Sequence, residues 1–328
     1  MSAHRVFTYK LPRCPAQSSF LFVQLTQQSL TNILPFTHYH FRLPSSKPVF
    51  STTFLMKLSI FAGALALFSS VQAQFNPWEA RHGMTSAQYQ TTFDSLVGQG
   101  YRLNYVTGYT INNVAIFAAV WEKKSSPAWV AHHGMTSTDY QNKFNTYTSQ
   151  GYRLVLVNGY TVNGIDNYVA IWDKSPSGSW IARHGMTSSQ YQSYFNTYTG
   201  QGYRLKHVSG YEIGTEARYA AIWEKTSDTS AWVARHGMTS AEYQTQFDNL
   251  TGLGYRLTLV SGYQVGSTDY YAAIWEKSPG PAFYARHGMT SPVYQQEFDN
   301  IVKQGYMLKV VSGYDQGQSD RYAAIWTK

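Results

Sequence analysis

One string of residues, His-Gly-Met-Thr-Ser, occurs five times in this chain, and its copies follow one another at intervals of 51, 51, 52 and 51 residues. A period of this length is typical of repeat proteins, in which each copy is one structural unit. The period therefore constrains the fold more than the total length of 328 residues does. We place a single repeat domain at 74–328, with units of about 78–127, 128–178, 179–230, 231–281 and 282–328.

The middle of each unit predicts one amphipathic helix. In the first unit, Thr85 and Gln88 have the spacing of a capping box, which is typical of a helix start. Tyr89 and Phe93 follow with the spacing of one helix face. A glycine then ends the pattern in every unit, as expected for a residue of positive φ after a helix. These glycines are Gly100, Gly151, Gly202, Gly254 and Gly305.

The rest of each unit predicts three strands. A short leading strand, Trp78 to His82 in the first unit, precedes the helix, and two alternating segments rich in Tyr, Val, Ile and Trp follow it. Between these two segments lies a residue type that accepts positive φ in a hairpin turn. The five turn residues are Asn112, Asn163, Gly214, Gly266 and Gly317. The fold class predicted is an α+β tandem repeat of five β-α-β-β units.

Five such units can stack into a closed, propeller-like ring or into an open solenoid. The spacing is even, and neither end unit has the polar outer face that caps an open array. We therefore expect a closed ring, with the open solenoid as the alternative.

A basic and an acidic residue recur in four units, 20 residues apart and centred on the hairpin turn. The fifth unit has Met307 and Thr327 instead, so both members are absent together. Cross-strand neighbours of opposite charge would explain this joint loss, because one member alone would lack compensation. We expect salt bridges within four hairpins, namely Arg102–Glu122, Arg153–Asp173, Arg204–Glu224 and Arg256–Glu276.

Residues 56–73 have the form of a secretory signal peptide. Lys57 provides the positive start, Leu58 to Phe68 the apolar segment, and Val71 to Ala73 the cleavage site. We expect translation to start at Met56, which makes 1–55 a doubtful upstream leader; the alternative is an unusually long positive region of the signal. The mature, secreted protein then begins near Gln74 and has no membrane segment after cleavage.

The net charge of +8 comes mostly from the leader, because residues 1–73 hold six of the 26 basic residues and none of the 18 acidic ones. The repeats are thus nearly neutral, and no basic run in them indicates a nucleic-acid partner. The single cysteine, Cys14, also lies in the leader, so the repeats contain no disulfide and no thiolate metal site.

Three strings, Ala-Arg-His-Gly-Met-Thr-Ser, Gly-Tyr-Arg-Leu and Tyr-Ala-Ala-Ile-Trp-Glu-Lys, resemble the family called bacterial tandem repeat domain 1, over essentially all of 78–328. In secreted fungal polyglycine hydrolases, this repeat region precedes a β-lactamase-like catalytic domain. The nucleophile motif of that domain, Ser-x-x-Lys, does not occur in this chain. The resemblance therefore implies the repeat region without its enzyme, and it supplies no activity.

The repeated histidine and the basic residue before it are the candidate ligand-binding residues. Placed beside tryptophans, such pairs have the chemistry to hold a glycan or an acidic peptide. The alternative is that each histidine closes its own strand-to-helix turn by a hydrogen bond. The candidate positions are Arg81 and His82, His132 and His133, Arg183 and His184, Arg235 and His236, and Arg286 and His287.

These features favour a secreted, non-catalytic, multivalent binding or targeting module for a cell-wall glycan or protein. We identify no catalytic residue, no metal ligand and no cofactor motif, and nothing in the sequence indicates the oligomeric state. The alternatives are a hydrolase accessory protein, a hydrolase with an unrecognised active site, and a structural protein of the extracellular matrix.

Overall fold

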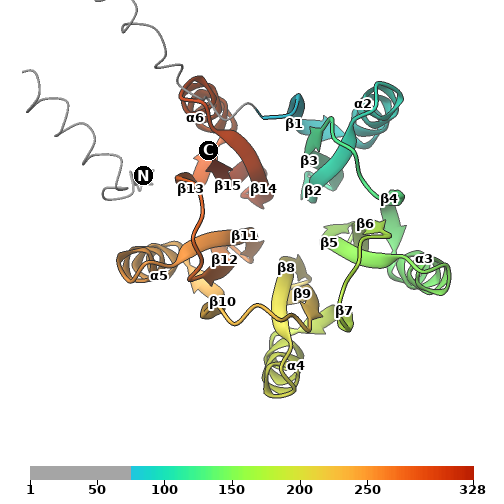
Figure 1. Cartoon of the computed structure of the whole chain (residues 1–328). Coiled ribbons are helices and arrows are strands. Elements are labelled where there is room, and N and C mark those ends of the chain that lie inside the picture. The colour runs from blue at the N-terminus through green and yellow to red at the C-terminus, as the bar shows by residue number, and fades with distance from the viewer. Residues whose placement is uncertain (1–74) are drawn as a thin grey trace, which may run out of the picture. The chain divides into compact units, whose positions relative to one another are not determined.

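The computed structural model describes residues 75–328, so the expected leader and signal peptide lie outside the described residues. The described chain is an α+β tandem repeat of five β-α-β-β units. Figure 1 shows these units arranged around a common centre, with the helices at the periphery. No helix within 75–328 has the length and apolar character needed to cross a membrane.

Each unit contributes one helix and three strands of nearly constant length. The leading strands are β1 (Trp78–Thr85), β4 (Trp129–Thr136), β7 (Trp180–Thr187), β10 (Trp232–Thr239) and β13 (Phe283–Thr290). The helices are α2 (Ser86–Gly98), α3 (Ser137–Ser149), α4 (Ser188–Gly200), α5 (Ser240–Gly252) and α6 (Ser291–Lys303). The second strands are β2 (Arg102–Ile111), β5 (Arg153–Val162), β8 (Arg204–Ile213), β11 (Arg256–Val265) and β14 (Met307–Gln316). The third strands are β3 (Val114–Glu122), β6 (Ile165–Asp173), β9 (Glu216–Glu224), β12 (Thr268–Glu276) and β15 (Ser319–Thr327).

The three strands of a unit form a small antiparallel sheet with the third strand in the middle, as in the order β1-β3-β2. The second strand is therefore an edge strand, and in every unit it lies on the side nearest the centre (Figure 1). The third strands are the most buried elements, because both of their edges are paired and the helix covers one face. Their tryptophans, Trp121 in the first unit and its four equivalents, have no exposed surface.

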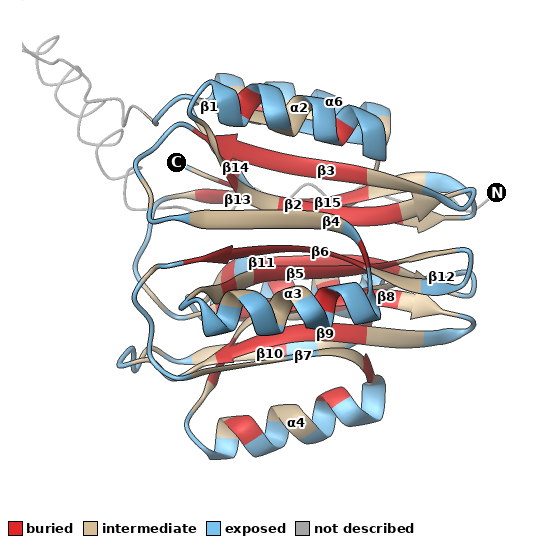
Figure 2. Ribbon diagram, turned by 90° about the vertical axis from the view of Figure 1, so that its right-hand side faces the viewer, coloured by how far each residue is buried: buried red, intermediate tan, exposed pale blue. Residues whose placement is uncertain are grey.

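The helix ends predicted from sequence are confirmed. The Thr85 side chain accepts from the backbone of Gln88 while the Gln88 side chain accepts from the backbone of Thr85, which is the reciprocal capping box. After the helix, Gly100 has a φ of 84°, a region that residues with a Cβ avoid. The turn residue Asn112 likewise has a φ of 51°. Each helix buries the side that faces its sheet and exposes the other (Figure 2).

A β-bulge interrupts each leading strand at the repeated histidine. In the first unit the register with β3 shifts between Arg81 and Met84, at His82 and Gly83. Gly83 has a φ of 65°, which glycine adopts without a steric penalty. The bulge changes the direction in which His82 projects from the strand, and the contacts of the histidines, given below, follow from this.

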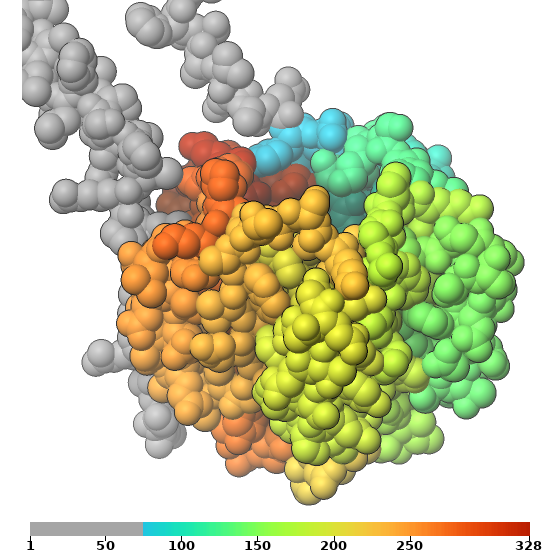
Figure 3. All heavy atoms as spheres, turned by 60° about the horizontal axis from the view of Figure 1, so that its bottom comes forward, coloured from blue at the N-terminus to red at the C-terminus, as the bar shows by residue number. Residues whose placement is uncertain are grey.

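Neighbouring units pack side by side (Figure 3), and their second strands contact one another. A glycine of one second strand faces a tyrosine ring of the next, and the two approach so closely that a Cβ on Gly108 would lie 2.6 Å from the Tyr160 ring. The first and fifth units make the same contact, with Tyr109 of β2 lying against Gly313 of β14. Tyr109 and Tyr322 also share a hydrogen bond between their hydroxyls, 2.6 Å long.

Three of the four expected salt bridges within hairpins, those of Arg102, Arg153 and Arg204, were wrong in their partners. The predicted register is present, since Arg102 is paired with Glu122 across the β2–β3 ladder. The guanidinium groups reach the acid of the following unit instead, at 2.5 Å for Arg102 to Asp173 and 2.8 Å for Arg153 to Glu224. Register fixes only the Cα positions, whereas a long side chain at a sheet edge is free to bond across the interface between sheets.

The same pattern accounts for the two uncharged positions of the fifth unit. Arg204 follows the rule, with Glu276 at 3.3 Å. By the same spacing, the residue at the acid position opposite Arg256 is Thr327. The residue at the arginine position opposite Glu122 of the first unit is Met307. Glu122 is instead bonded by Lys124 and by Asn76 and Asn104 of its own unit.

Candidate binding sites

The repeated histidines lie at interfaces between units. His133 packs edge-on against Tyr89 and Phe117 of the preceding unit, with ring centroids 4.8 and 5.2 Å apart. Its Nε2 is 3.1 Å from the hydroxyl of Ser86, at the start of the preceding helix. His184, His236 and His287 make the corresponding contacts, and His82 packs on Tyr294 and Tyr322 of the fifth unit. The alternative that each histidine bonds within its own turn was therefore also wrong in the partner.

Burial keeps these imidazoles neutral near pH 7. Loss of hydration lowers the pKa of His133, His184 and His236 below the ordinary value of 6.5. Burial lowers the pKa of His82 as well, although the nearby Asp320 opposes the change. The most buried of the five, His287, has its pKa lowered to about 4. A neutral imidazole that bonds a serine and packs on two rings acts as part of the scaffold.

The basic residue before each histidine contacts its own unit instead. Arg81, Arg183 and Arg235 each donate to the carbonyl of the preceding alanine. In the other two units, His132 bonds the hydroxyl of Tyr147 at 2.6 Å, and Arg286 bonds Glu297 at 2.8 Å. The two members of each pair therefore contact different units, and the structure does not bring the ten candidate residues together into one site.

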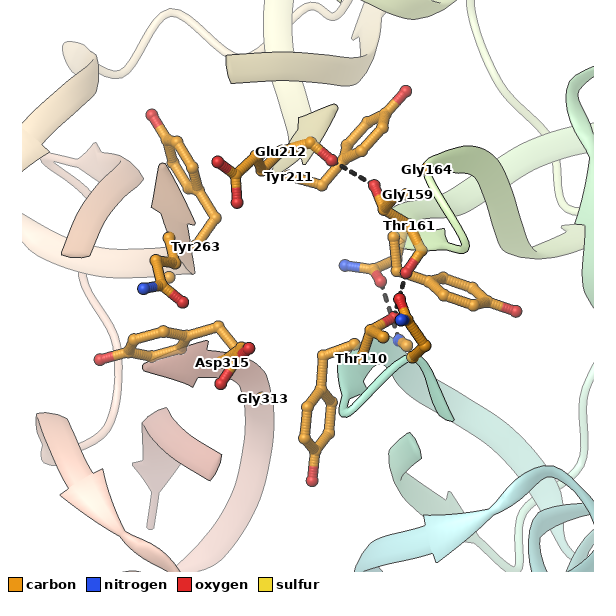
Figure 4. A pocket seen from close by; sticks show the side chains of 18 of the residues that line it. Thr110, Gly159, Thr161, Gly164, Tyr211, Glu212, Tyr263, Gly313 and Asp315 are labelled. Carbon is orange, nitrogen blue, oxygen red and sulfur yellow. Dashed lines mark hydrogen bonds between the residues drawn. The ribbon is translucent and has the colours of Figure 1, made fainter. Parts of the chain in front are cut away.

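A second location, which the candidate residues did not include, is a cavity of about 420 Å³ at the five hairpin turns, called the turn cavity below. All five second strands line it with a Gly-Tyr pair and the residue that follows (Figure 4). The Gly-Tyr pairs are Gly108–Tyr109, Gly159–Tyr160, Gly210–Tyr211, Gly262–Tyr263 and Gly313–Tyr314. The residues that follow are Thr110, Thr161, Glu212, Gln264 and Asp315.

The walls of the turn cavity are fixed by bonds between neighbouring units. The backbone N–H of Gly159 donates to the Ser209 hydroxyl of the next unit at 3.1 Å, and similar bonds join three further pairs of units. The tyrosine rings point away from the cavity centre (Figure 4), and four of their hydroxyls bond a tyrosine of the preceding unit's third strand. Tyr160 faces Phe117 in that place and accepts from Gly134 instead. Because four of the glycine N–H groups and four of the tyrosine hydroxyls bond other units, the walls of the cavity are held in place without a ligand.

Three hydrogen-bond donors on the cavity wall already bond backbone carbonyls of the hairpins. The Thr110 hydroxyl donates to the carbonyl of Thr161, and the Thr161 hydroxyl donates to the carbonyl of Glu212. The Gln264 amide donates to the carbonyl of Gly266 at 2.8 Å. Since a hydroxyl has one hydrogen and two lone pairs, the threonines still have lone pairs to offer a ligand.

The charged side chains on the wall are two carboxylates, Glu212 and Asp315 (Figure 4). Burial raises the pKa of Glu212, and the charge of Asp315 raises it further, against a bond from the Gly266 N–H at 2.7 Å. Burial also raises the pKa of Asp315, against bonds from the backbone of its own turn and the charge of Arg321. Each carboxylate would therefore gain from a nearby positive charge.

Tyr105 and His207, from the second strands of the first and third units, are not among the residues that line the turn cavity. Their ring centroids lie 6.3 Å apart. His207 is itself buried and bonds the carbonyl of Val157 at 2.8 Å.

From the sequence, the hairpin tips are the next most plausible place for a site after the Arg/His positions, but no residue of the turn cavity was among the candidates, although the sequence contained a signal for them. Every unit keeps the Gly-Tyr pair, whereas the next residue is Thr, Thr, Glu, Gln or Asp. A position that varies inside an otherwise uniform motif is one that the scaffold does not constrain. Within residues 75–328, no group of three or more His, Cys, Asp or Glu side chains has an arrangement suited to a metal ion.

The family model described as "Polyglycine hydrolase-like, structural repeat" matches five stretches of the chain. The matched residues are 75–124, 126–175, 177–226, 229–278 and 280–328.

Proposed function

The chain belongs to the polyglycine hydrolase-like structural repeat family, and on that premise we propose that it is a secreted, non-catalytic binding module for an extracellular glycan. The family description supports a scaffold rather than an active site. The observation that carries the proposal is the turn cavity, to which all five units contribute. Its volume of about 420 Å³ lies in the range of small-ligand sites, roughly 300–1,000 Å³.

The lining favours a glycan over an apolar ligand. Hydroxyl lone pairs, amide oxygens and two carboxylates face a ligand there, and these acceptors are complementary to the hydroxyl donors of a sugar. Two of the lining turn residues are glycines, Gly164 and Gly214, which add no side chain to the cavity.

Five equivalent sites at the Arg/His positions are less well supported. The histidines already bond the preceding unit, and the basic side chains already bond their own unit. A ligand would have to replace these contacts. We therefore place one ligand in the pocket that the five units share.

The test is binding to insoluble cell-wall polysaccharide and to a glycan array, with Gln264→Trp as the blocking variant. Gln264 bonds its own turn, so an indole at this position fills the pocket without breaking an interface between units. Gln192→Trp, on the exposed side of α4, is the matched control. We expect binding by the parent and the control, and at least about tenfold weaker binding by Gln264→Trp. Equal binding by all three proteins would place the site elsewhere.

We further propose that the five units form a closed, propeller-like ring. The contacts of Tyr109 with Gly313 and with Tyr322, and of His82 with Tyr294, support closure, because they join the first unit to the fifth. Gly313→Ala tests this, since the added methyl group would collide with the Tyr109 ring only in a closed ring.

Gly210→Ala, which faces the Tyr263 ring at an interface inside the array, is the reference. In a closed ring both variants should lower the melting temperature by similar amounts, equivalent to about 1–3 kcal/mol of overpacking. An open solenoid would show the loss for Gly210→Ala alone.

A further inference from the structure

The turn cavity combines an acidic wall with a shortage of positive charge. Its described lining residues include Glu212 and Asp315 but no Lys, Arg or His. Two basic residues of the hairpins have partners of their own: Arg218 bonds Glu216 at 2.8 Å, and Arg321 donates to the Asp320 carbonyl at 3.0 Å. Arg321 only partly offsets the effect of burial on Asp315.

The threonines and Gln264 in the uncharged part of the wall also offer acceptors to a ligand. The threonine hydroxyls and the Gln264 amide donate hydrogen bonds to backbone carbonyls. The lone pairs on their oxygen atoms can still accept from a ligand. A ligand complementary to this wall supplies donor hydrogens and positive charge together. An ammonium group, with three hydrogens and a full charge, meets both requirements in the least volume.

We infer that the turn cavity binds an amino sugar through its free ammonium group, with Glu212 and Asp315 as the recognising residues. This inference rests on the proposed glycan-binding function and names the sugar class. The ammonium bonds the carboxylates, while the ring hydroxyls donate to the threonine and glutamine oxygens. Acetylation of the nitrogen removes the charge and two of the hydrogens, so the cavity distinguishes the amine from the amide.

The experiment compares two probes, the β-1,4-linked tetramer of glucosamine and the tetramer of N-acetylglucosamine, by titration calorimetry at about pH 6, where the amine is largely charged. For the parent protein we expect the glucosamine tetramer to bind at least about tenfold more tightly, since a charge-assisted bond is worth on the order of 1.5–3 kcal/mol. Equal or tighter binding of the acetylated tetramer, or no binding of the free amine, overturns the inference.

The variants use residues that the repeat itself accepts at this position. Glu212→Gln and Asp315→Gln copy Gln264 of the fourth unit, so folding should be preserved. Each should weaken binding of the glucosamine tetramer about tenfold and leave the acetylated tetramer little changed. The reverse change, Gln264→Glu, adds a third carboxylate and should strengthen binding of the amine.

Asp94→Asn is the matched control, because it removes the same charge from the exposed side of α2, and the second and third units have Asn145 and Asn196 there. If Asp94→Asn weakens binding as much as Glu212→Gln does, the attraction comes from net charge and the inference fails. If the acetylated tetramer binds at least as tightly as the glucosamine tetramer, and Gln264→Trp blocks both while Glu212→Gln weakens neither, the proposed function stands and the inference on the amine is wrong.

Discussion

At the scale of single residues, His207 connects burial to acid stability. It lies on β8 near Tyr105, and burial lowers its pKa to about 4, although its bond to the Val157 carbonyl acts in the opposite direction. The unfolded chain takes up this proton near pH 6.5, so the stability contributed by the neutral form is complete above pH 6.5 and is lost as the pH falls toward 4. The full effect is roughly 3 kcal/mol.

His207→Leu should reduce this acid sensitivity. The second and fourth units carry Leu156 and Leu259 at the same position, so the substitution fits the packing. We expect the melting temperature of the variant to fall less than that of the parent between about pH 6.5 and 4. Parallel melting curves for the two proteins over that range would show that His207 does not remain neutral when folded.

The ion pair between Arg153 and Glu224 makes a second residue-scale prediction. It has two short bonds, 2.8 and 3.1 Å, and both side chains are mostly buried. Arg153→Met copies Met307 and leaves Glu224 without its partner, at a cost of about 1–3 kcal/mol in urea unfolding. The double variant Arg153→Met with Glu224→Thr should recover part of the loss. If the two single changes simply add, the pair is not coupled.

At the scale of elements, helix capping differs between units, so a helix without a side-chain cap bond is the control for a helix that has one. Thr187 caps α4, with its hydroxyl 3.2 Å from the Gln190 N–H, whereas Thr290 before α6 makes no side-chain cap bond and Pro292 lies in the first turn of that helix. Thr187→Ala should therefore cost about 1 kcal/mol, and Thr290→Ala clearly less. Urea unfolding of the two variants beside the parent measures the difference. Equal losses would mean that threonine acts through something other than capping.

At the scale of the whole molecule, a closed ring has no preferred starting unit. A circular permutant of 75–328 that opens at Ser125 and Ser126, in the linker between the first two units, and joins Lys328 to Phe75 through a short Gly-Ser segment keeps every interface of a ring. We expect its melting temperature to stay near that of the parent. An open array would lose the interface between the first and second units, and its melting temperature would fall markedly.

The helix ends, the turns and the strand register within one unit could be predicted from the sequence. The Thr85 cap, the positive φ at Gly100 and the Asn112 turn depend on neighbours a few residues away, and the register of Arg102 with Glu122 follows from the turn between them. The sequence does not show which unit each side chain contacts. His133 reaches Ser86 across 47 residues and Arg102 reaches Asp173 across 71. These contacts, like the cavity formed by five distant hairpins, depend on how units pack, and the pattern within one unit is the same whichever neighbour its side chains meet.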